Sequence, residues 1–177
     1  MKTETLQLER LATPTGRMLL ASDEQGRVHA LDWQDHEERM QRLLGRYHRN
    51  VKLSLRDASK KSAAKRALLA YFDGQLDAIT QVKVATSGTA FQNQVWTALR
   101  RIPHGLTLSY GALAKKIGRP AAVRAVGLAN GANPIAIIVP CHRVIGANAT
   151  LTGYGGGLER KRWLLDHEGA GTARQLD

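Results

Sequence analysis

The spacing of apolar residues changes at Gly88, and this change limits the fold more than any other feature of the chain. Before Gly88, short runs with strand-like alternation are followed by segments with helical spacing. After it, short helical segments are separated by Gly and Pro. We therefore predict an α+β chain with two domains: residues 1–87 form a small mixed α/β domain with antiparallel strands, and residues 88–177 form a mostly helical domain.

In the first domain, three runs predict the strands of a meander: residues 5–12, 17–22 and 27–33. Two runs with helical spacing predict helices: residues 35–48 and 59–74. Ser59 is the expected N-cap of the second helix, and Gly74 is its expected end. Residues 81–88 then predict a last strand that leads into a linker.

In the second domain, four segments predict helices: residues 89–102, 109–118, 119–133 and 158–169. Ser109 is the expected N-cap of the second of these, Gly118 ends it, and Pro120 lies in the first turn of the third. Two short helices joined so tightly have the outline of a helix-turn-helix. Antiparallel helix pairs are common, so the outline alone is a weak signal.

Small residues dominate the helix predicted at 119–133: Ala121, Ala122, Ala125, Gly127, Ala129 and Gly131. Among them Arg124 stands out as a long side chain. A helix this bare can approach another backbone closely. That backbone belongs either to a nucleic acid or to a neighbouring helix of the same protein, and the small residues alone favour neither.

The charge is distributed unevenly. The chain has a formal net charge of +11, and no Asp or Glu occurs from Ala78 to Leu158. Eight basic residues fall in that stretch: Lys83, Arg100, Arg101, Lys115, Lys116, Arg119, Arg124 and Arg143. Such a field favours DNA or RNA through release of counterions, although a basic surface without a partner would look the same.

The chain contains one Cys, which excludes an internal disulfide and a Cys-rich zinc site. With no HExxH motif either, we expect no metal and no other cofactor. No apolar run approaches about 20 residues, and the first twenty residues lack a signal core, so a cytoplasmic protein without membrane contact is expected.

The single thiol, Cys141, is followed directly by His142 and Arg143. A thiol reacts as thiolate, so a reactive Cys needs a base or a positive field. His142 could serve through a turn or a bridging water, with an orienting carboxylate from Glu159, Asp166 or Glu168. The helix predicted at 158–169 would turn Trp163 and Leu164 inward and carry these acids. A buried, inert Cys is the alternative reading.

Two stretches resemble a known family. "IPHGLTLSYGALAKKIGRPAAVRAVGLANGANPIAIIVPCHRVIG" and "LTGYGGGLERKRWLLDHEG" are similar to the O6-alkylguanine-DNA alkyltransferases, with the PCHRV signature at 140–144. The resemblance is dense from Phe91 to Gly169 and looser before it. It implies a ribonuclease H-like N-terminal domain and a winged-helix-like C-terminal domain that contains the helix-turn-helix.

The resemblance also implies a single-turnover repair reaction on O6-alkylguanine in duplex DNA, with O4-alkylthymine as a further substrate left open. Cys141 would accept the alkyl group, with roles in catalysis also for His142, Glu168 and Asn133. The substrate would be contacted by Tyr110, Arg124, Val144, Tyr154 and Gly155. DNA would be bound through its minor groove by Ser109, Ala121, Arg124, Ala125 and Gly127.

Within these roles, His142 would act as base through a water, Glu168 would orient it, and Asn133 would hold the turn. Tyr110 would donate to a guanine ring nitrogen, and Arg124 would fill the space of the extruded nucleotide. A monomer is expected, with cooperative assembly on DNA left open. Three other readings remain: a non-covalent lesion-binding relative of these enzymes, a Cys–His hydrolase and a helix-turn-helix regulator.

Overall fold

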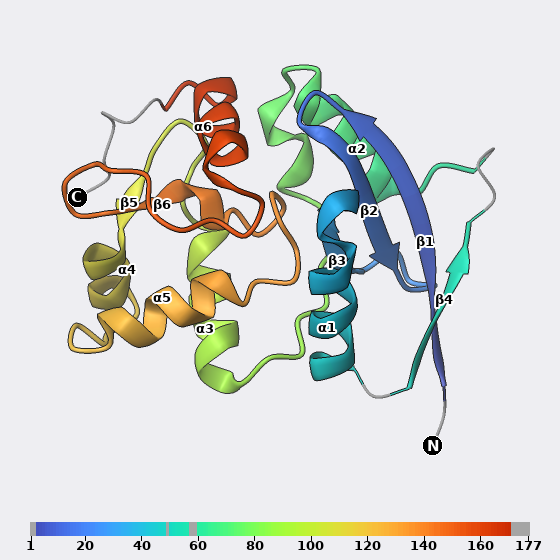
Figure 1. The fold of residues 1–177 in the computed structure, drawn as a ribbon, viewed down its shortest axis with the longest axis horizontal. Coiled ribbons are helices and arrows are strands. Elements are labelled where there is room, and N and C mark those ends of the chain that lie inside the picture. The colour runs from blue at the N-terminus through green and yellow to red at the C-terminus, as the bar shows by residue number, and fades with distance from the viewer. Residues whose placement is uncertain (1–2, 49, 57–59, 171–177) are drawn as a thin grey trace. The chain divides into compact units, whose positions relative to one another are not determined.

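The computed structural model describes residues 3–48, 50–56 and 60–170. The chain divides into two compact units, Met1–Ser87 and Gly88–Asp177 (Figure 1). In the described residues, no helix is both long enough and apolar enough to cross a membrane.

The first unit is built on a mixed sheet. Its strands, as far as the chain is described, are β1 (Glu4–Thr13), β2 (Gly16–Ser22), β3 (Val28–Trp33) and β4 (Val51–Leu55), in the order β3-β2-β1-β4. The three strands of the predicted meander are confirmed, with β1–β2 and β2–β3 antiparallel. Strand β4 was not predicted, and it pairs with β1 in parallel.

A helix connects β3 to β4, as a parallel strand requires a crossover. After the short helix η1 (Gln34–His36), α1 (Glu37–Tyr47) packs one face on the sheet. Met40 and Leu44 of this helix lie in one apolar cluster with Leu6, Leu19 and Ala30 of the strands.

Helix α2 (Ala63–Phe72) begins later than predicted. Its N-cap is Ser62, whose side chain accepts from the backbone N–H of Lys65 at 3.1 Å. The prediction of Ser59 as N-cap is therefore wrong, and Ser59 itself lies outside the described residues. Gly74, with a φ of 102°, follows the helix as expected.

After η2 (Leu76–Ile79), the strand predicted at 81–88 does not form. Val84 makes only an isolated bridge with Val28 of β3.

The second unit consists of short helices and a small parallel pair of strands. Its elements, in the described part of the chain, are α3 (Ala90–Leu99), β5 (Leu108–Ser109), α4 (Tyr110–Lys116), α5 (Val123–Gly131), η3 (Cys141–Arg143), β6 (Val144–Ile145) and α6 (Leu158–His167). Thr89 and Gln92 form a capping box at the start of α3. The buried indole of Trp96 donates to the carbonyl of Ala129 at 2.9 Å and so fixes α3 against α5.

The predicted helix pair is present as α4 and α5. Ser109 caps α4 as predicted, because its side chain accepts from the N–H of Ala112 at 3.1 Å. Gly118, with a φ of 73°, lies in the turn after α4. The prediction for Pro120 is wrong: it lies in a turn closed by Ala122 N–H donating to the carbonyl of Arg119 at 2.9 Å, and α5 starts only at Val123.

Candidate active site

Two tight turns set the position of Cys141. In the first, the N–H of Ile138 donates to the carbonyl of Ala136 at 2.7 Å, and the intervening Ile137 has a φ of 69°. This conformation costs a β-branched residue about 1–3 kcal/mol. In the second, the N–H of Cys141 donates to the carbonyl of Val139 at 2.8 Å. Every residue from 134 to 145 is buried, so packing holds the strained segment in place.

The side chain of Asn133 hydrogen-bonds to the backbone at two points of this segment. Its Oδ1 accepts from the N–H of Ile135 at 2.9 Å, and its Nδ2 donates to the carbonyl of Val139 at 2.8 Å. Both partners precede Cys141, so Asn133 fixes the backbone that leads into the thiol.

Cys141, His142 and Arg143 form the short helix η3, which lies near α6 (Figure 1). The ring of His142 is fully buried, and its Nε2 lies 2.7 Å from Oε1 of Glu168, the residue that caps the C-terminus of α6. Glu168 is therefore the downstream acid that contacts His142.

Arg143, for which no role was predicted, holds the same carboxylate. Its Nε donates to Oε2 of Glu168 at 2.9 Å and its Nη2 donates to Oε1 at 2.9 Å, while its Nη1 donates to the carbonyl of Ile102 at 2.6 Å. A two-point contact of this kind fixes the plane of the carboxylate.

The charges around His142 leave its ring neutral and able to accept a proton. Burial by itself would raise the pKa of Glu168, but the charges and hydrogen bonds of His142 and Arg143 hold that pKa well below its usual range. Burial lowers the pKa of His142, against the opposing effect of Glu168, so we assign a neutral ring.

A carboxylate can only accept, so Nε2 of the neutral ring carries the hydrogen and Nδ1 carries the lone pair. This Nδ1 is buried and has no hydrogen-bond partner among the described residues. A buried lone pair on the residue that follows the thiol in η3 is suited to receive a proton.

Lys161 is a further buried charged residue, and the sequence analysis did not predict a role for it. It is 0% exposed, and its Nζ donates to the carbonyl of Thr152 at 2.8 Å. Burial lowers the pKa of Lys161 to about 8, and the charge of Cys141 opposes this shift, so the two groups lie within electrostatic reach of each other. The inner face of α6 is formed by Lys161, Leu164 and Leu165, whereas Trp163, predicted to point inward, is only half-buried and stacks on His167.

The pairing of β5 with β6 brings other predicted site residues near the thiol segment. Val144 directly follows η3 and pairs with Leu108, and Ser109 pairs with Ile145. Tyr110 is the first residue of α4 and thus follows this pair. A Cβ on Gly127 would lie 3.9 Å from Cδ1 of Tyr110, so Gly127 is where α5 runs close to that ring.

The remaining predicted residues lie on a loop and on an exposed helix face. Tyr154 is half-buried and Gly155 exposed in the loop before α6. Arg124 and Ala125 are exposed on α5, and Ala121 is exposed in the turn before it.

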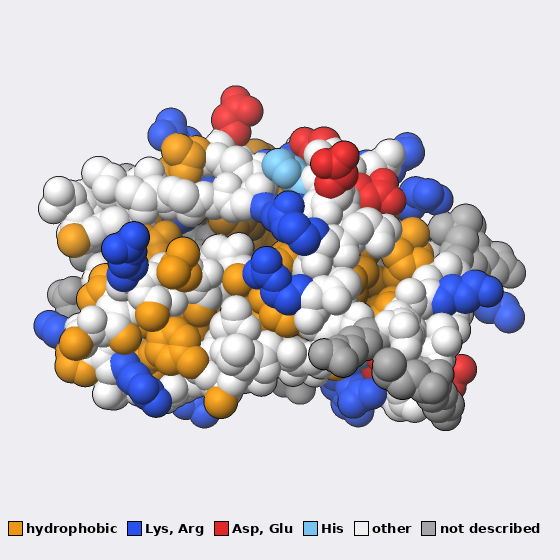
Figure 2. Space-filling model, turned by 60° about the horizontal axis from the view of Figure 1, so that its bottom comes forward, with side chains coloured by type: hydrophobic (Ala, Val, Ile, Leu, Met, Phe, Trp, Pro, Cys, Tyr) orange, Lys and Arg blue, Asp and Glu red, His pale blue; other side chains and the backbone are white. Residues whose placement is uncertain are grey.

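Leu128 is 71% exposed one turn after Arg124, so the exposed face of α5 also carries a large apolar side chain, which the sequence analysis did not single out. Figure 2 shows hydrophobic side chains next to Lys and Arg side chains over the left of the view.

Comparison with known proteins matches both units to one family. Residues 8–86 match the model of the "6-O-methylguanine DNA methyltransferase, ribonuclease-like domain", and residues 90–170 match the "6-O-methylguanine DNA methyltransferase, DNA binding domain".

Individual relatives agree with these matches. The methylated-DNA–protein-cysteine methyltransferase of Salmonella typhimurium is 50% identical over 161 residues, covering 91% of this chain and 94% of the relative. The crystal structure of Mycobacterium tuberculosis OGT in complex with DNA is similar at a TM-score of 0.75 with 42% identity and covers 92% of both chains. With both of its units matched in this way, the chain belongs to the 6-O-methylguanine DNA methyltransferase family.

Proposed function

We propose that the chain repairs DNA as a methylated-DNA–protein-cysteine methyltransferase, in which Cys141 takes the alkyl group from O6 of guanine. The observation that carries this proposal is the buried lone pair on Nδ1 of His142, the residue next to Cys141 in η3, in a ring whose Nε2 lies against Glu168.

The first step is removal of the thiol proton. Nδ1 of His142 takes it from Cys141 through a water, and the resulting imidazolium is stabilised by the carboxylate of Glu168 at 2.7 Å. The ammonium of Lys161 provides further positive charge near the sulfur.

In the transfer step, the thiolate attacks the alkyl carbon and the bond from that carbon to O6 of guanine breaks. The electron pair of that bond stays with the guanine, and the Tyr110 hydroxyl donates to a ring nitrogen as this charge develops. The proton that left the thiol passes from the His142 imidazolium through solvent to that ring nitrogen, so the products are neutral guanine and a thioether. The backbone carbonyls of Cys141 and Val144 read the guanine amino group, and Tyr154 and Gly155 wall the pocket. A thioether forms on Cys141 that no group of the site can remove, so each chain reacts once.

Access to the base from the minor groove requires that the nucleotide leave the duplex, because O6 lies on the major-groove edge of guanine. The exposed face of α5 carries Arg124, Ala125, Leu128 and Gly131, a set with one charge that suits close approach to a minor groove. Arg124 fills the space of the extruded nucleotide, and Leu128 packs against the sugars that line the groove. Ser109, Ala121 and Gly127 complete this surface.

The chain is proposed to act as a monomer on double-stranded DNA in the cytoplasm, where a reactive thiol stays reduced.

The test of the proposed function is a count of the methyl groups that are transferred to each chain. With excess duplex that carries a labelled O6-methylguanine, label on the protein should reach one methyl group per chain and stop. A Cys141→Ala variant should bind the duplex without taking label. Continued turnover, or label on the Cys141→Ala variant, would refute the proposal.

A further inference from the structure

A second cluster of chemically capable side chains lies in the first unit. Glu4 begins β1, His29 lies near the start of β3, and His48 follows the end of α1. One potential ligand atom from each of the three lies within 4.8 Å of the other two. The methyltransferase chemistry uses none of them.

His29 owes its orientation to an irregularity in the sheet. Ala21 pairs with Ala30, but the next residue of β2, Ser22, pairs with Val28, so His29 is the extra residue of a β-bulge. Bulges re-aim a side chain and are typical of functional positions. Here the re-aimed ring is 3% exposed and faces the side chains of Asp23 and His48.

Asp23 fixes which nitrogen of His29 is available. Its Oδ2 lies 2.9 Å from Nε2 of His29 and also accepts from Nε of Arg27 at 2.7 Å, while its Oδ1 accepts from the backbone of Gln25 and Arg27. The carboxylate can only accept, so Nε2 of His29 carries a hydrogen and Nδ1 presents its lone pair. A carboxylate behind a His in this way is the usual outer partner of a metal-binding imidazole.

The spacing of the two imidazoles fits a tetrahedral ion. Nδ1 of His29 and Nε2 of His48 face each other at 3.3 Å. Two nitrogens that each lie about 2.0–2.1 Å from a zinc ion in tetrahedral geometry are themselves about 3.3–3.4 Å apart. Glu4 is 43% exposed and can move, and its carboxylate oxygens lie 3.8 Å from Nε2 of His29 and 4.0 Å from Nδ1 of His48.

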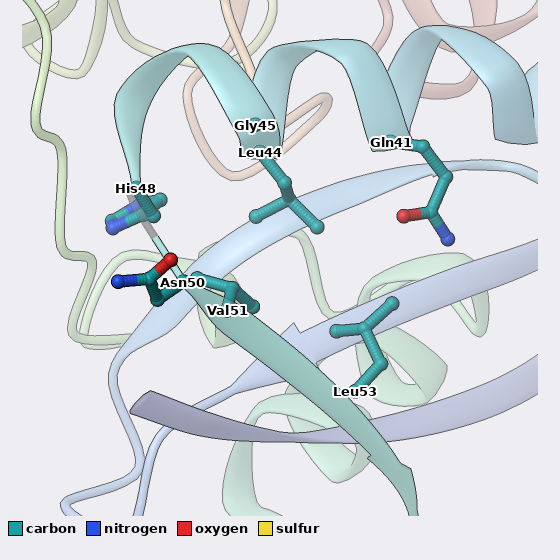
Figure 3. A pocket seen from close by; sticks show the side chains of 7 residues that line it. All are labelled: Gln41, Leu44, Gly45, His48, Asn50, Val51 and Leu53. Carbon is teal, nitrogen blue, oxygen red and sulfur yellow. The ribbon is translucent and has the colours of Figure 1, made fainter. Parts of the chain in front are cut away.

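An entry path is also present. His48 lines an open pocket of about 410 Å³ between α1 and β4, together with Gln41, Leu44, Gly45, Asn50, Val51 and Leu53 (Figure 3). A metal site needs such a route from solvent as well as ligands and outer partners.

We propose that Glu4, His29 and His48 form a zinc site in the first unit, with a water as fourth ligand and Asp23 as the outer partner of His29. Two imidazoles and one carboxylate are ligands that suit Zn²⁺, and the open position distinguishes the site from a closed structural one. The ion would bridge β1, β3 and the end of α1, and its binding would therefore stabilise the first unit.

The test uses the full-length chain, stripped of metal by a chelator, with Cys141→Ala as background so that the reactive thiol cannot bind the probe. Zn²⁺ is titrated by calorimetry, and Co²⁺ is titrated by visible absorption as a reporter of tetrahedral coordination. We expect one equivalent of each ion, and Zn²⁺ should raise the thermal midpoint.

Three variants test whether Zn²⁺ binding depends on these residues. His48→Gln should lower the affinity for Zn²⁺ at least tenfold, and Asp23→Asn, which keeps an acceptor for the turn amides, should lower it by about 10–100-fold. His36→Gln removes a half-exposed histidine of the same unit and should change nothing. If His48→Gln binds Zn²⁺ as the background protein does, or if the background protein binds none, the two rings share only a proton and the proposal is wrong. None of these outcomes bears on alkyl transfer, which is measured with Cys141 present.

Discussion

Substitution of Glu168 by Gln should affect both the stability of the fold and the rate of alkyl transfer. The change keeps the shape of the side chain and one acceptor oxygen but removes its charge. Arg143, whose side chain is 7% exposed, would then lack its counter-ion within the cluster. The ring of His142 would lose the carboxylate that lies 2.7 Å from its Nε2.

The magnitudes follow from these contacts. Removal of one partner from a buried ion pair costs about 3–5 kcal/mol. A domain has about 5–15 kcal/mol of stability in total, so the variant should still fold. Loss of an oriented general base should slow the transfer by about 10²–10⁴-fold. Affinity for DNA should hardly change, because Glu168 is buried and so is not part of the surface that would meet a phosphate.

The assay is urea unfolding combined with the single-turnover rate on a duplex that contains O6-methylguanine. Glu159→Gln is the matched control, because Glu159 is exposed in the first turn of α6, and it should alter neither quantity. The double variant Arg143→Met/Glu168→Gln removes both charges and should recover part of the stability but none of the rate. A Glu168→Gln protein with unchanged stability and rate would refute the reasoning.

Three further results are expected. The free energy of unfolding should fall in acid, because the pKa of Glu168 is lowered in the folded state from its ordinary value of 4.5. The contribution of Glu168 to stability is therefore full above about pH 5 and decreases as the pH falls below that value. Urea unfolding between pH 3 and 7 should show a weaker decrease in Glu168→Gln than in the wild-type protein. Lys161→Met should raise the free energy of unfolding at pH 7, because burial lowers the pKa of Lys161 to about 8, while the single-turnover rate falls; a loss of stability would contradict this. Arg124→Ala, and less so Arg124→Lys, should slow repair of duplex DNA far more than reaction with free O6-methylguanine, and equal losses on both substrates would assign Arg124 to the pocket or the fold.

Local signals in the sequence predicted much of the fold. Ser109 caps α4 because a hydroxyl at that position satisfies a free N–H, and the hairpin of β1 and β2 follows from alternation around a Pro-Thr-Gly turn. The prediction of Ser59 as the N-cap of α2 was wrong because Ser62, three residues later, can take the same capping role. Ser62 also lies where its backbone N–H can donate to Glu9 at 3.0 Å.

Long-range pairing could not be read in the same way. The five residues of β4, VKLSL, alternate apolar and polar side chains as a strand does, but this short pattern does not show that they pair in parallel with the edge of β1. Arg143 and Lys161 look like surface residues until the fold buries them. Glu4, His29 and His48 are far apart in sequence, so no metal-binding motif marks them, although the bulge at His29 brings them together.

The most direct test of the account is to locate the transferred group. Wild-type protein is incubated with an excess of duplex that contains O6-methylguanine, digested, and mapped by peptide mass. We predict that one peptide, the one with Cys141, gains the mass of one methyl group in every chain, and that the duplex gains an equal amount of guanine. A methyl group on any other residue, or repaired duplex with Cys141 unmodified, would contradict the account.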